Sequence, residues 1–177
     1  MGNSVSTEGL AKEFQVSQSE IIELKKIYKE NCGRSRFLSR EKFRKVYNKV
    51  FPGDASQFAD IMFNKFDTDN NGRVDMREFI IGLLMSDAKD VNKKIEFAFE
   101  MYDIDKSGTI SRDEVIQISQ AYSRMYNTDE GTMVADRLFE YMDKNRDEEI
   151  SFEEFSEAAR SNSEILNLLF PKPPGST

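Results

Sequence analysis

Three twelve-residue stretches of this chain repeat one spacing of oxygen-bearing side chains. They read DTDNNGRVDMRE, DIDKSGTISRDE and DKNRDEEISFEE, and they begin at Asp67, Asp103 and Asp143. Each has such a side chain at positions 1, 3, 5, 9 and 12, and position 12 is always Glu. Ca²⁺ prefers about six to eight oxygen ligands, which a twelve-residue loop supplies from these positions and from the carbonyl of position 7. The spacing therefore predicts calcium-binding loops.

The three stretches differ in how well they match the full calcium-loop pattern. DTDNNGRVDMRE matches completely, with Gly72 at the sharp turn of position 6. DIDKSGTISRDE departs only at Ser107, whose hydroxyl oxygen can still coordinate a cation. DKNRDEEISFEE carries Glu148 at the turn, where a left-handed backbone costs a non-Gly residue about 1–2 kcal/mol. We predict two strong sites and a weaker third site, with loss of binding as the alternative.

Both side-chain and backbone oxygens belong to the predicted ligand set. At position 7 the expected ligand is the backbone carbonyl rather than the side chain. Mg²⁺ also binds oxygen ligands, so we expect it in these loops when Ca²⁺ is absent. The predicted ligands are Asp67, Asp69, Asn71, Arg73, Asp75, Glu78, Asp103, Asp105, Ser107, Thr109, Ser111, Glu114, Asp143, Asn145, Asp147, Glu149, Ser151 and Glu154.

Amphipathic helical patterns stand before and after each loop and repeat with it. The three calcium loops begin 36 and then 40 residues apart, which is the signature of an internal repeat. Each repeat is therefore predicted to be a helix–loop–helix unit. Its large apolar residues recur four positions before the loop, one position before it and directly after it, at Phe63, Phe99, Phe139, Phe66, Tyr102, Met142, Phe79, Val115 and Phe155.

A fourth copy of this helix–loop–helix repeat has the loop NCGRSRFLSREK at residues 31–42, and this loop lacks the acids of the other three. Lys42 replaces the Glu of position 12, and a cation at that position repels Ca²⁺. We expect this first loop to be free of metal but still folded, and to pair with the second loop through Leu38 and Val74.

The predicted fold class is all-α: four helix–loop–helix units in two paired lobes, with short antiparallel β bridges between the loops. Ser17 and Glu20 form a capping-box pattern that opens the first long helix. Residues 86–90 are the expected hinge between the lobes. The expected parts are an N-terminal arm (1–16), an N-terminal pair of units (17–86), a C-terminal pair (90–160) and a C-terminal helix and tail (161–177).

Composition excludes several other function classes. The formal net charge of −7 argues against a nucleic-acid partner. The chain has no His, which removes Ser-His and Cys-His nucleophiles and most zinc sites, and its acids stand at ligand spacing, so we predict that it is not an enzyme. The single Cys fits a reducing compartment, and the longest apolar stretch, residues 79–85, is too short to span a bilayer. No secretory leader pattern opens the chain, so we expect a cytoplasmic protein.

The first residues, MGNSVS, predict attachment to a membrane by lipidation. Gly2 with Ser6 matches the N-myristoylation pattern. One myristoyl chain binds a membrane only marginally, so a second attraction is needed. Residues 25–49 offer basic side chains for an anionic membrane surface, although a solvated helix face or an acidic partner would also explain them. The cations are Lys25, Lys26, Lys29, Arg34, Arg36, Arg40, Lys42, Arg44, Lys45 and Lys49.

Taken together, these motifs resemble the neuronal calcium sensor family of EF-hand proteins, the recoverin/frequenin group. The resemblance rests on MGNSVS, the first loop with Cys32, and the segments at 66–83, 97–111, 142–155 and 163–169. The chain departs from the family in having no Trp and in placing Gly33 after Cys32 where members usually have Pro, which indicates a divergent member.

The resemblance implies a calcium sensor that regulates a membrane-associated target protein. Calcium would open the paired helices and expose an apolar groove in the N-terminal half, where an amphipathic helix of the target docks. The C-terminal segment would either cover a groove or pack on the C-terminal lobe. A constitutive calcineurin-B-like subunit and a calcium buffer remain as alternatives. The implied groove residues are Leu24, Ile27, Tyr28, Phe43, Val46, Tyr47, Phe58, Met62, Phe63, Ile80, Leu83 and Leu84.

Overall fold

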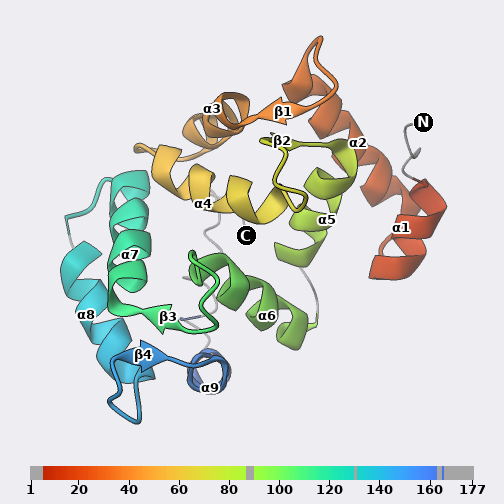
Figure 1. Ribbon diagram of the computed structural model, residues 1–177. Helices are drawn as coiled ribbons and strands as arrows, with labels where there is room; N and C mark the ends of the chain where they lie inside the picture. The colour runs from red at the N-terminus through yellow and green to blue at the C-terminus, as the bar shows by residue number, and fades with distance from the viewer. Residues whose placement is uncertain (1–5, 87–89, 130, 163–164, 166–177) are drawn as a thin grey trace.

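The computed structural model of the chain describes residues 6–86, 90–129, 131–162 and 165. Within these residues it is built from helices joined by loops that contain two-residue strands (Figure 1). The helices are α1 (Thr7–Phe14), α2 (Gln18–Cys32), α3 (Arg40–Val50), α4 (Ser56–Phe66), α5 (Met76–Ser86), α6 (Val91–Tyr102), α7 (Arg112–Tyr126), α8 (Gly131–Met142) and α9 (Phe152–Ser161). The strands are β1 (Leu38–Ser39), β2 (Arg73–Val74), β3 (Ile110–Ser111) and β4 (Glu149–Ile150).

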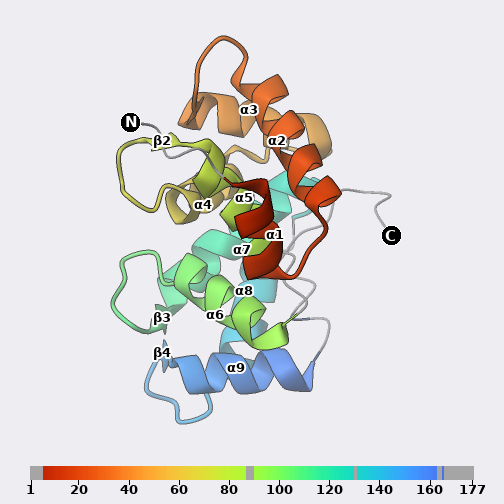
Figure 2. The same ribbon diagram turned by 90° about the vertical axis from the view of Figure 1, so that its right-hand side faces the viewer.

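Four helix–strand–helix units follow one another along the chain, and their loops pair two by two. β1 and β2 are antiparallel, with Leu38 opposite Val74, and β3 and β4 are antiparallel, with Ile110 opposite Ile150. The two pairs of units are stacked, with α2 to α5 in the upper half of Figure 2 and α6, α8 and α9 in the lower half. The predicted fold class is therefore confirmed, including the pairing of Leu38 with Val74.

The loop ends also start the helices that follow them. Ser111 and Glu114 form a reciprocal capping box at the start of α7, and Ser151 and Glu154 form another at the start of α9. The hydroxyl of each Ser accepts a hydrogen bond from the N–H three residues later, which satisfies one donor that the first helical turn leaves open. Because these Ser and Glu residues are positions 9 and 12 of the loops, the cap fixes how the Glu enters the loop.

The core is made from the apolar residues that the repeat predicts. All nine of the recurring large residues are buried, and Phe63 and Phe139 have no exposed surface. They belong to one continuous cluster of buried side chains that extends through both pairs of units. Burial of such large side chains contributes roughly 1.5–3 kcal/mol each, so the helix frame is held by the residues that flank the loops.

The two pairs of units meet where the segment after α3 contacts the end of α7. The backbone N–H of Gly53 donates a hydrogen bond of 2.9 Å to the carbonyl of Met125. Beside it, the rings of Phe58 and Tyr122 pack edge to face with their centroids 5.3 Å apart. A Cβ atom at Gly53 would lie 2.0 Å from the carbonyl oxygen of Arg124, so this contact requires glycine.

Two helices differ from the predicted boundaries, and two predicted segments lie largely outside the described residues. The N-terminal arm contains α1, which the sequence analysis did not predict. Its Leu10 is buried, and the hydroxyl of Ser6 caps its first turn. α7 continues to Tyr126, whereas the repeat pattern predicts that the third helix–loop–helix unit ends at residue 123. Residues 87–89 of the expected hinge, and all but Ile165 of 163–177, lie outside the described residues.

Candidate metal centres

The first Asp of each calcium loop stands at the end of the preceding helix and gathers the loop backbone around its carboxylate. Asp67 and Asp103 are buried, with exposed fractions of 6% and 8%. The carboxylate of Asp67 accepts hydrogen bonds from the N–H groups of Asn71 (3.0 Å) and Gly72 (2.9 Å). Asp103 does the same with Ser107 and Gly108, both at 2.9 Å. The loop is thus wrapped around an anionic group at its centre.

The Glu at position 12 turns both carboxylate oxygens into the loop. One oxygen of Glu114 accepts from the N–H of Ile104 at 2.7 Å, and the other accepts from the N–H of Ser111 at 2.8 Å. Glu78 makes the equivalent contacts with Thr68 (3.0 Å) and Asp75 (2.9 Å). Both oxygens of one carboxylate are thus held within the loop, as bidentate binding of a cation requires.

In the second and third loops three acids converge. Asp67, Asp69 and Glu78 each place a carboxylate oxygen within 4.8 Å of the others, and so do Asp103, Asp105 and Glu114. Three like charges at this separation repel strongly unless a cation lies between them. The donor set is all oxygen, which suits Ca²⁺ or Mg²⁺ rather than a metal that prefers nitrogen or sulfur. The residues present therefore fit the ion that the sequence predicts.

The fourth loop follows the same backbone path with its acids at different ligand positions. Glu148 adopts φ +68°, in the region occupied by Gly72 (+77°) and Gly108 (+94°), so the predicted left-handed turn is present. Among the described residues, which include this entire loop, no third group of three acids is as close as those of the other two loops. The fourth loop has the amide of Asn145 at position 3, where the other loops have Asp, and the carboxylate of Asp147 at position 5, where they have Asn71 and Ser107.

Glu154 of the fourth loop is stabilised in its ionised form. Burial acts to raise the pKa of its carboxyl group, but hydrogen bonds from Ser151 and from the N–H groups of Asn145 and Lys144 outweigh this effect. The net pKa lies below the ordinary value for Glu. The position-12 acid of this loop is therefore ready to act as a ligand.

The first loop is closed by its own side chains. Asn31 and Cys32 belong to α2, and the amide of Asn31 donates back to the carbonyl of Ile27 at 2.8 Å instead of entering the loop. The ammonium of Lys42 lies inside the loop, where it donates to the carbonyl of Cys32 at 2.6 Å and to the hydroxyl of Ser35 at 2.7 Å. A cation that belongs to the chain thus stands in the interior of this loop.

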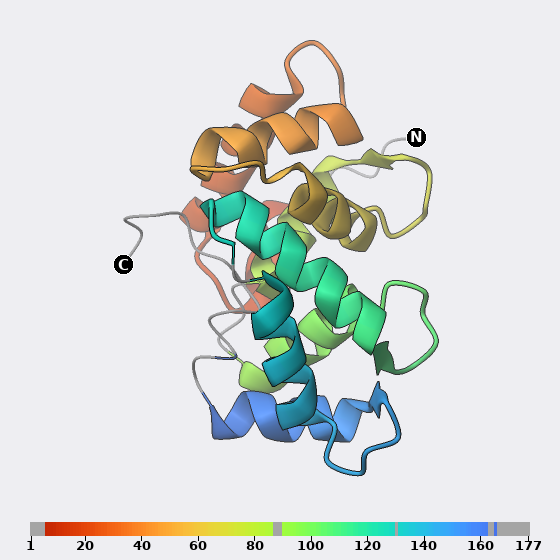
Figure 3. The same ribbon diagram turned by 90° about the vertical axis from the view of Figure 1, so that its left-hand side faces the viewer.

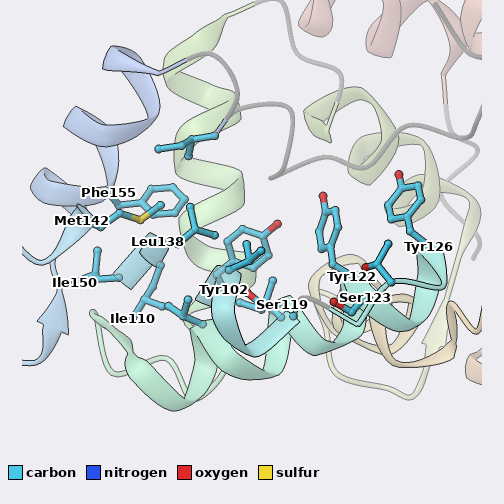
Figure 4. Close-up of a pocket in the computed structure, with 16 residues that line it drawn as sticks. Tyr102, Ile110, Ser119, Tyr122, Ser123, Tyr126, Leu138, Met142, Ile150 and Phe155 are labelled. Carbon is cyan, nitrogen blue, oxygen red and sulfur yellow. The ribbon is translucent and has the colours of Figure 1, made fainter. Parts of the chain in front are cut away.

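An apolar cavity of about 590 Å³ opens in the C-terminal half, between α6, α7, α8 and α9. Figure 4 shows Ile110, Ile150 and Phe155 at one end of it, and Tyr122 and Tyr126 at the other. Ile165 also lines the cavity and is buried. Its lining residues are Tyr102, Ile110, Val115, Ile118, Ser119, Tyr122, Ser123, Tyr126, Thr128, Gly131, Val134, Leu138, Met142, Ile150, Phe155 and Ile165. No motif of the sequence predicts this cavity.

The residues of the implied N-terminal groove lie mostly in the core. Tyr47 and Leu83 are half-buried and Ile27 has an exposed fraction of 37%. An N-terminal groove therefore stays a prediction about the calcium-bound protein. The buried members are Tyr28, Phe43, Phe58, Met62, Phe63, Ile80 and Leu84.

Much of the basic stretch at 25–49 is paired within the protein. Arg44 forms two hydrogen bonds with the carboxylate of Asp60, at 2.7 and 2.6 Å, and Lys45 pairs with Glu41. Arg40 also contacts Asp60, at 3.5 Å. Lys29, Arg34, Arg36 and Lys49 are exposed. Gly2 lies outside the described residues, and none of the described helices is both long and apolar enough to cross a bilayer.

Comparisons with known proteins agree with this geometry. The family model of the EF-hand domain pair matches residues 92–160, and that of the EF hand matches residues 58–83. Recoverin of Homo sapiens is 31% identical over an alignment of 187 positions, which covers 96% of this chain and 93% of recoverin. S-modulin of Aquarana catesbeiana is 31% identical over an alignment of 191 positions, which covers 98% of this chain and 94% of S-modulin. The similarity thus extends over nearly the whole chain.

Proposed function

This chain belongs to the neuronal calcium sensor family of EF-hand proteins, and we propose that it binds Ca²⁺ at its second, third and fourth loops and thereby controls its association with a target protein. The observation that carries the proposal is the convergence of three carboxylates within 4.8 Å in each of the second and third loops. The fourth loop is the weaker site in this proposal. Mg²⁺ occupies the same loops when Ca²⁺ is scarce.

The chain's own residues would bind and respond to the ion in two ways. Asp67 and Asp103 hold the loop backbone while Glu78 and Glu114 close it from the other side. Calcium supplies two positive charges that these carboxylates neutralise. Because Glu78 lies in α5 and Glu114 in α7, any change in the carboxylate position is passed to a helix. The acids act here as ligands rather than as acid–base catalysts.

Calorimetric titration of the full chain with Ca²⁺ tests the metal assignment. Loops of this kind in sensors bind with dissociation constants on the order of 10⁻⁷–10⁻⁵ M. Glu78→Gln and Glu114→Gln should each remove one binding event, because an amide cannot bind through two anionic oxygens. Glu153→Gln is the matched control, since it removes an exposed acid next to Glu154 that is not at a ligand position. Full calcium stoichiometry in Glu114→Gln would contradict the assignment.

For the target we propose an amphipathic helix, with the C-terminal cavity as an additional docking surface. The cavity is lined mainly by apolar and tyrosine side chains, from helices whose loops are predicted to bind calcium. A large-to-charged change at its wall, Leu138→Glu, should abolish calcium-dependent binding of an apolar fluorescent dye to the protein. Glu140→Gln on the exposed face of the same helix is the control. A dye response that needs no calcium would favour a constitutive subunit, and no response at all would favour a buffer.

We also propose N-myristoylation at Gly2 and peripheral binding to anionic membranes. The exposed cations Lys29, Arg34, Arg36 and Lys49 support this proposal. Each Lys or Arg near an anionic surface contributes on the order of 1 kcal/mol, so Lys29→Ala should lower binding to phosphatidylserine vesicles about fivefold. Lys45→Ala, which removes a cation already paired with Glu41, should have a smaller effect. Acylated protein that sediments with vesicles no better than Gly2→Ala would refute the lipid anchor.

A further inference from the structure

The first loop contains a hydrogen-bond network that joins the positions used for metal binding in the other loops. Lys42 is position 12, Ser35 is position 5, and the carbonyl of Phe37 is position 7. The ammonium of Lys42 donates to the hydroxyl of Ser35 at 2.7 Å, and that hydroxyl contacts the carbonyl of Phe37 at 2.7 Å. The ammonium also donates to the carbonyl of Cys32 at 2.6 Å.

The contacts of Lys42 are those of an ion held by neutral oxygen atoms. Within the described residues it forms no ion pair with Asp or Glu, whereas Arg44 and Lys45 on the same helix both pair with an acid. Hydrogen bonds that involve a charged group are shorter and stronger than neutral ones. Lys42 is half-buried, so its bonds are less weakened by water than those of an exposed side chain.

The first loop is joined to the second loop in two places. Leu38 pairs with Val74 across β1 and β2. The hydroxyl of the buried Tyr28 also lies 2.9 Å from the carbonyl of Arg36 in the first loop and 3.0 Å from that of Val74 in the second. Burial raises the pKa of Tyr28 well above its ordinary value, so the hydroxyl keeps its proton and remains a donor. A change in the conformation of the first loop would therefore affect the position of the backbone at Val74, between Arg73 and Asp75 of the second loop.

We infer that the Lys42 ammonium takes the place of a metal ion in the first loop and, through β1 and β2, pre-positions the second loop for calcium. Lys42 is therefore a positioning residue. It contacts no metal, but it stabilises the first loop and β1, and β1 pairs with β2 of the second loop. The first loop stays closed whether or not Ca²⁺ is present, so the second loop does not have to order its partner when it binds. This inference rests on the proposed binding of calcium by the second loop.

The test isolates the second loop in the full chain. In a background of Glu114→Gln and Glu154→Gln, the third and fourth loops are silenced and calorimetry reports the second loop alone. Lys42→Met keeps the length of the side chain but removes its charge and donors. We expect it to weaken calcium binding by the second loop about tenfold, or about 1.4 kcal/mol, and to speed amide hydrogen exchange in β1 and β2 of the calcium-free protein. Lys45→Met on the same helix is the matched control and should change neither.

Equal affinities and equal exchange rates for Lys42→Met and Lys45→Met would overturn the inference. If Lys42→Met does not fold, Ser35→Ala carries the test, because it removes one acceptor of the ammonium and should weaken binding about threefold. Ser35→Ala with the affinity and exchange rates of the unmodified protein would likewise overturn it. If the background binds no Ca²⁺, the proposed function of the second loop fails, and exchange in the calcium-free protein still decides the role of Lys42.

Discussion

Thr109 and Glu149 join the third and fourth loops directly, because Oγ1 of Thr109 donates a hydrogen bond of 2.6 Å to a carboxylate oxygen of Glu149. Both residues stand at position 7, whose carbonyl is a predicted ligand. They precede Ile110 and Ile150, which are paired across β3 and β4. A shift of one loop therefore moves a ligand of the other.

We expect this bond to couple calcium binding at the two loops. Thr109→Val keeps the shape of the side chain but removes the donor, and it should weaken binding at the fourth loop about fivefold, or roughly 1 kcal/mol. A double-mutant cycle with Glu149→Gln, measured by calorimetry, isolates the pairwise contribution. Glu148→Gln controls for the loss of charge alone. If the effects of Thr109→Val and Glu149→Gln simply add, the loops are not coupled through this bond.

Replacing Glu148 by Gly should strengthen the fourth site. Glu148 has φ +68°, a conformation that costs a non-Gly residue about 1–2 kcal/mol, so relief of that strain should tighten calcium binding by about tenfold. Glu148→Gln separates strain from charge, because it keeps the strained backbone and removes only the carboxylate. Titration of both variants would identify the limiting factor. An unchanged affinity in Glu148→Gly would show that the turn does not limit this site.

Gly53→Ala should loosen the contact between the two pairs of units. The added Cβ would lie 2.0 Å from a backbone carbonyl oxygen that cannot move without disturbing the end of α7. Such overpacking costs about 1–3 kcal/mol, and each 1 kcal/mol lowers Tm by about 2–4 °C in a chain of this size. Thermal unfolding of the calcium-free protein measures the change. Gly9→Ala is the control, since its Cβ would approach nothing closer than 3.4 Å.

Lys42→Glu should not create a calcium site in the first loop. Position 1 is Asn31, whose amide is bonded within α2, and position 3 is Gly33, which has no side chain. A new carboxylate would also face the carbonyl of Cys32 that now accepts a bond from the ammonium. Calorimetry should find the same number of calcium ions as in the unmodified chain, with a lower Tm. An additional calcium ion would refute this account of the loop.

Much of the fold could be predicted because each repeat has large apolar residues at fixed positions before and after its loop. Phe63, Phe99 and Phe139 occupy one position relative to their loops, and all three are buried in the core. The helix α1 was missed because eight residues give too little periodicity, although Ser6 as a cap and Leu10 with Phe14 at a spacing of four were available signals.

The candidate sites were predicted in part, for a related physical reason. The charge of Lys42 indicates that Ca²⁺ is repelled, but the sequence does not tell where a flexible side chain will find its acceptors. Likewise, the sequence pattern predicts Phe58 as a groove residue. In the structure its ring packs against the ring of Tyr122, which is distant in sequence. Local spacing predicts ligand sets well, whereas contacts between distant segments need the assembled structure.

The second, third and fourth loops lie along one side of the molecule, at the left of Figure 2 and at the right of Figure 3. Their acids give that side a concentrated negative potential, while the formal net charge of the whole chain is −7. Calcium ions at the second and third loops alone would change this total to −3, and the entire change would fall on one side. Occupancy of the loops would therefore turn the electric dipole of the molecule, and with it the orientation in which the protein approaches any charged surface.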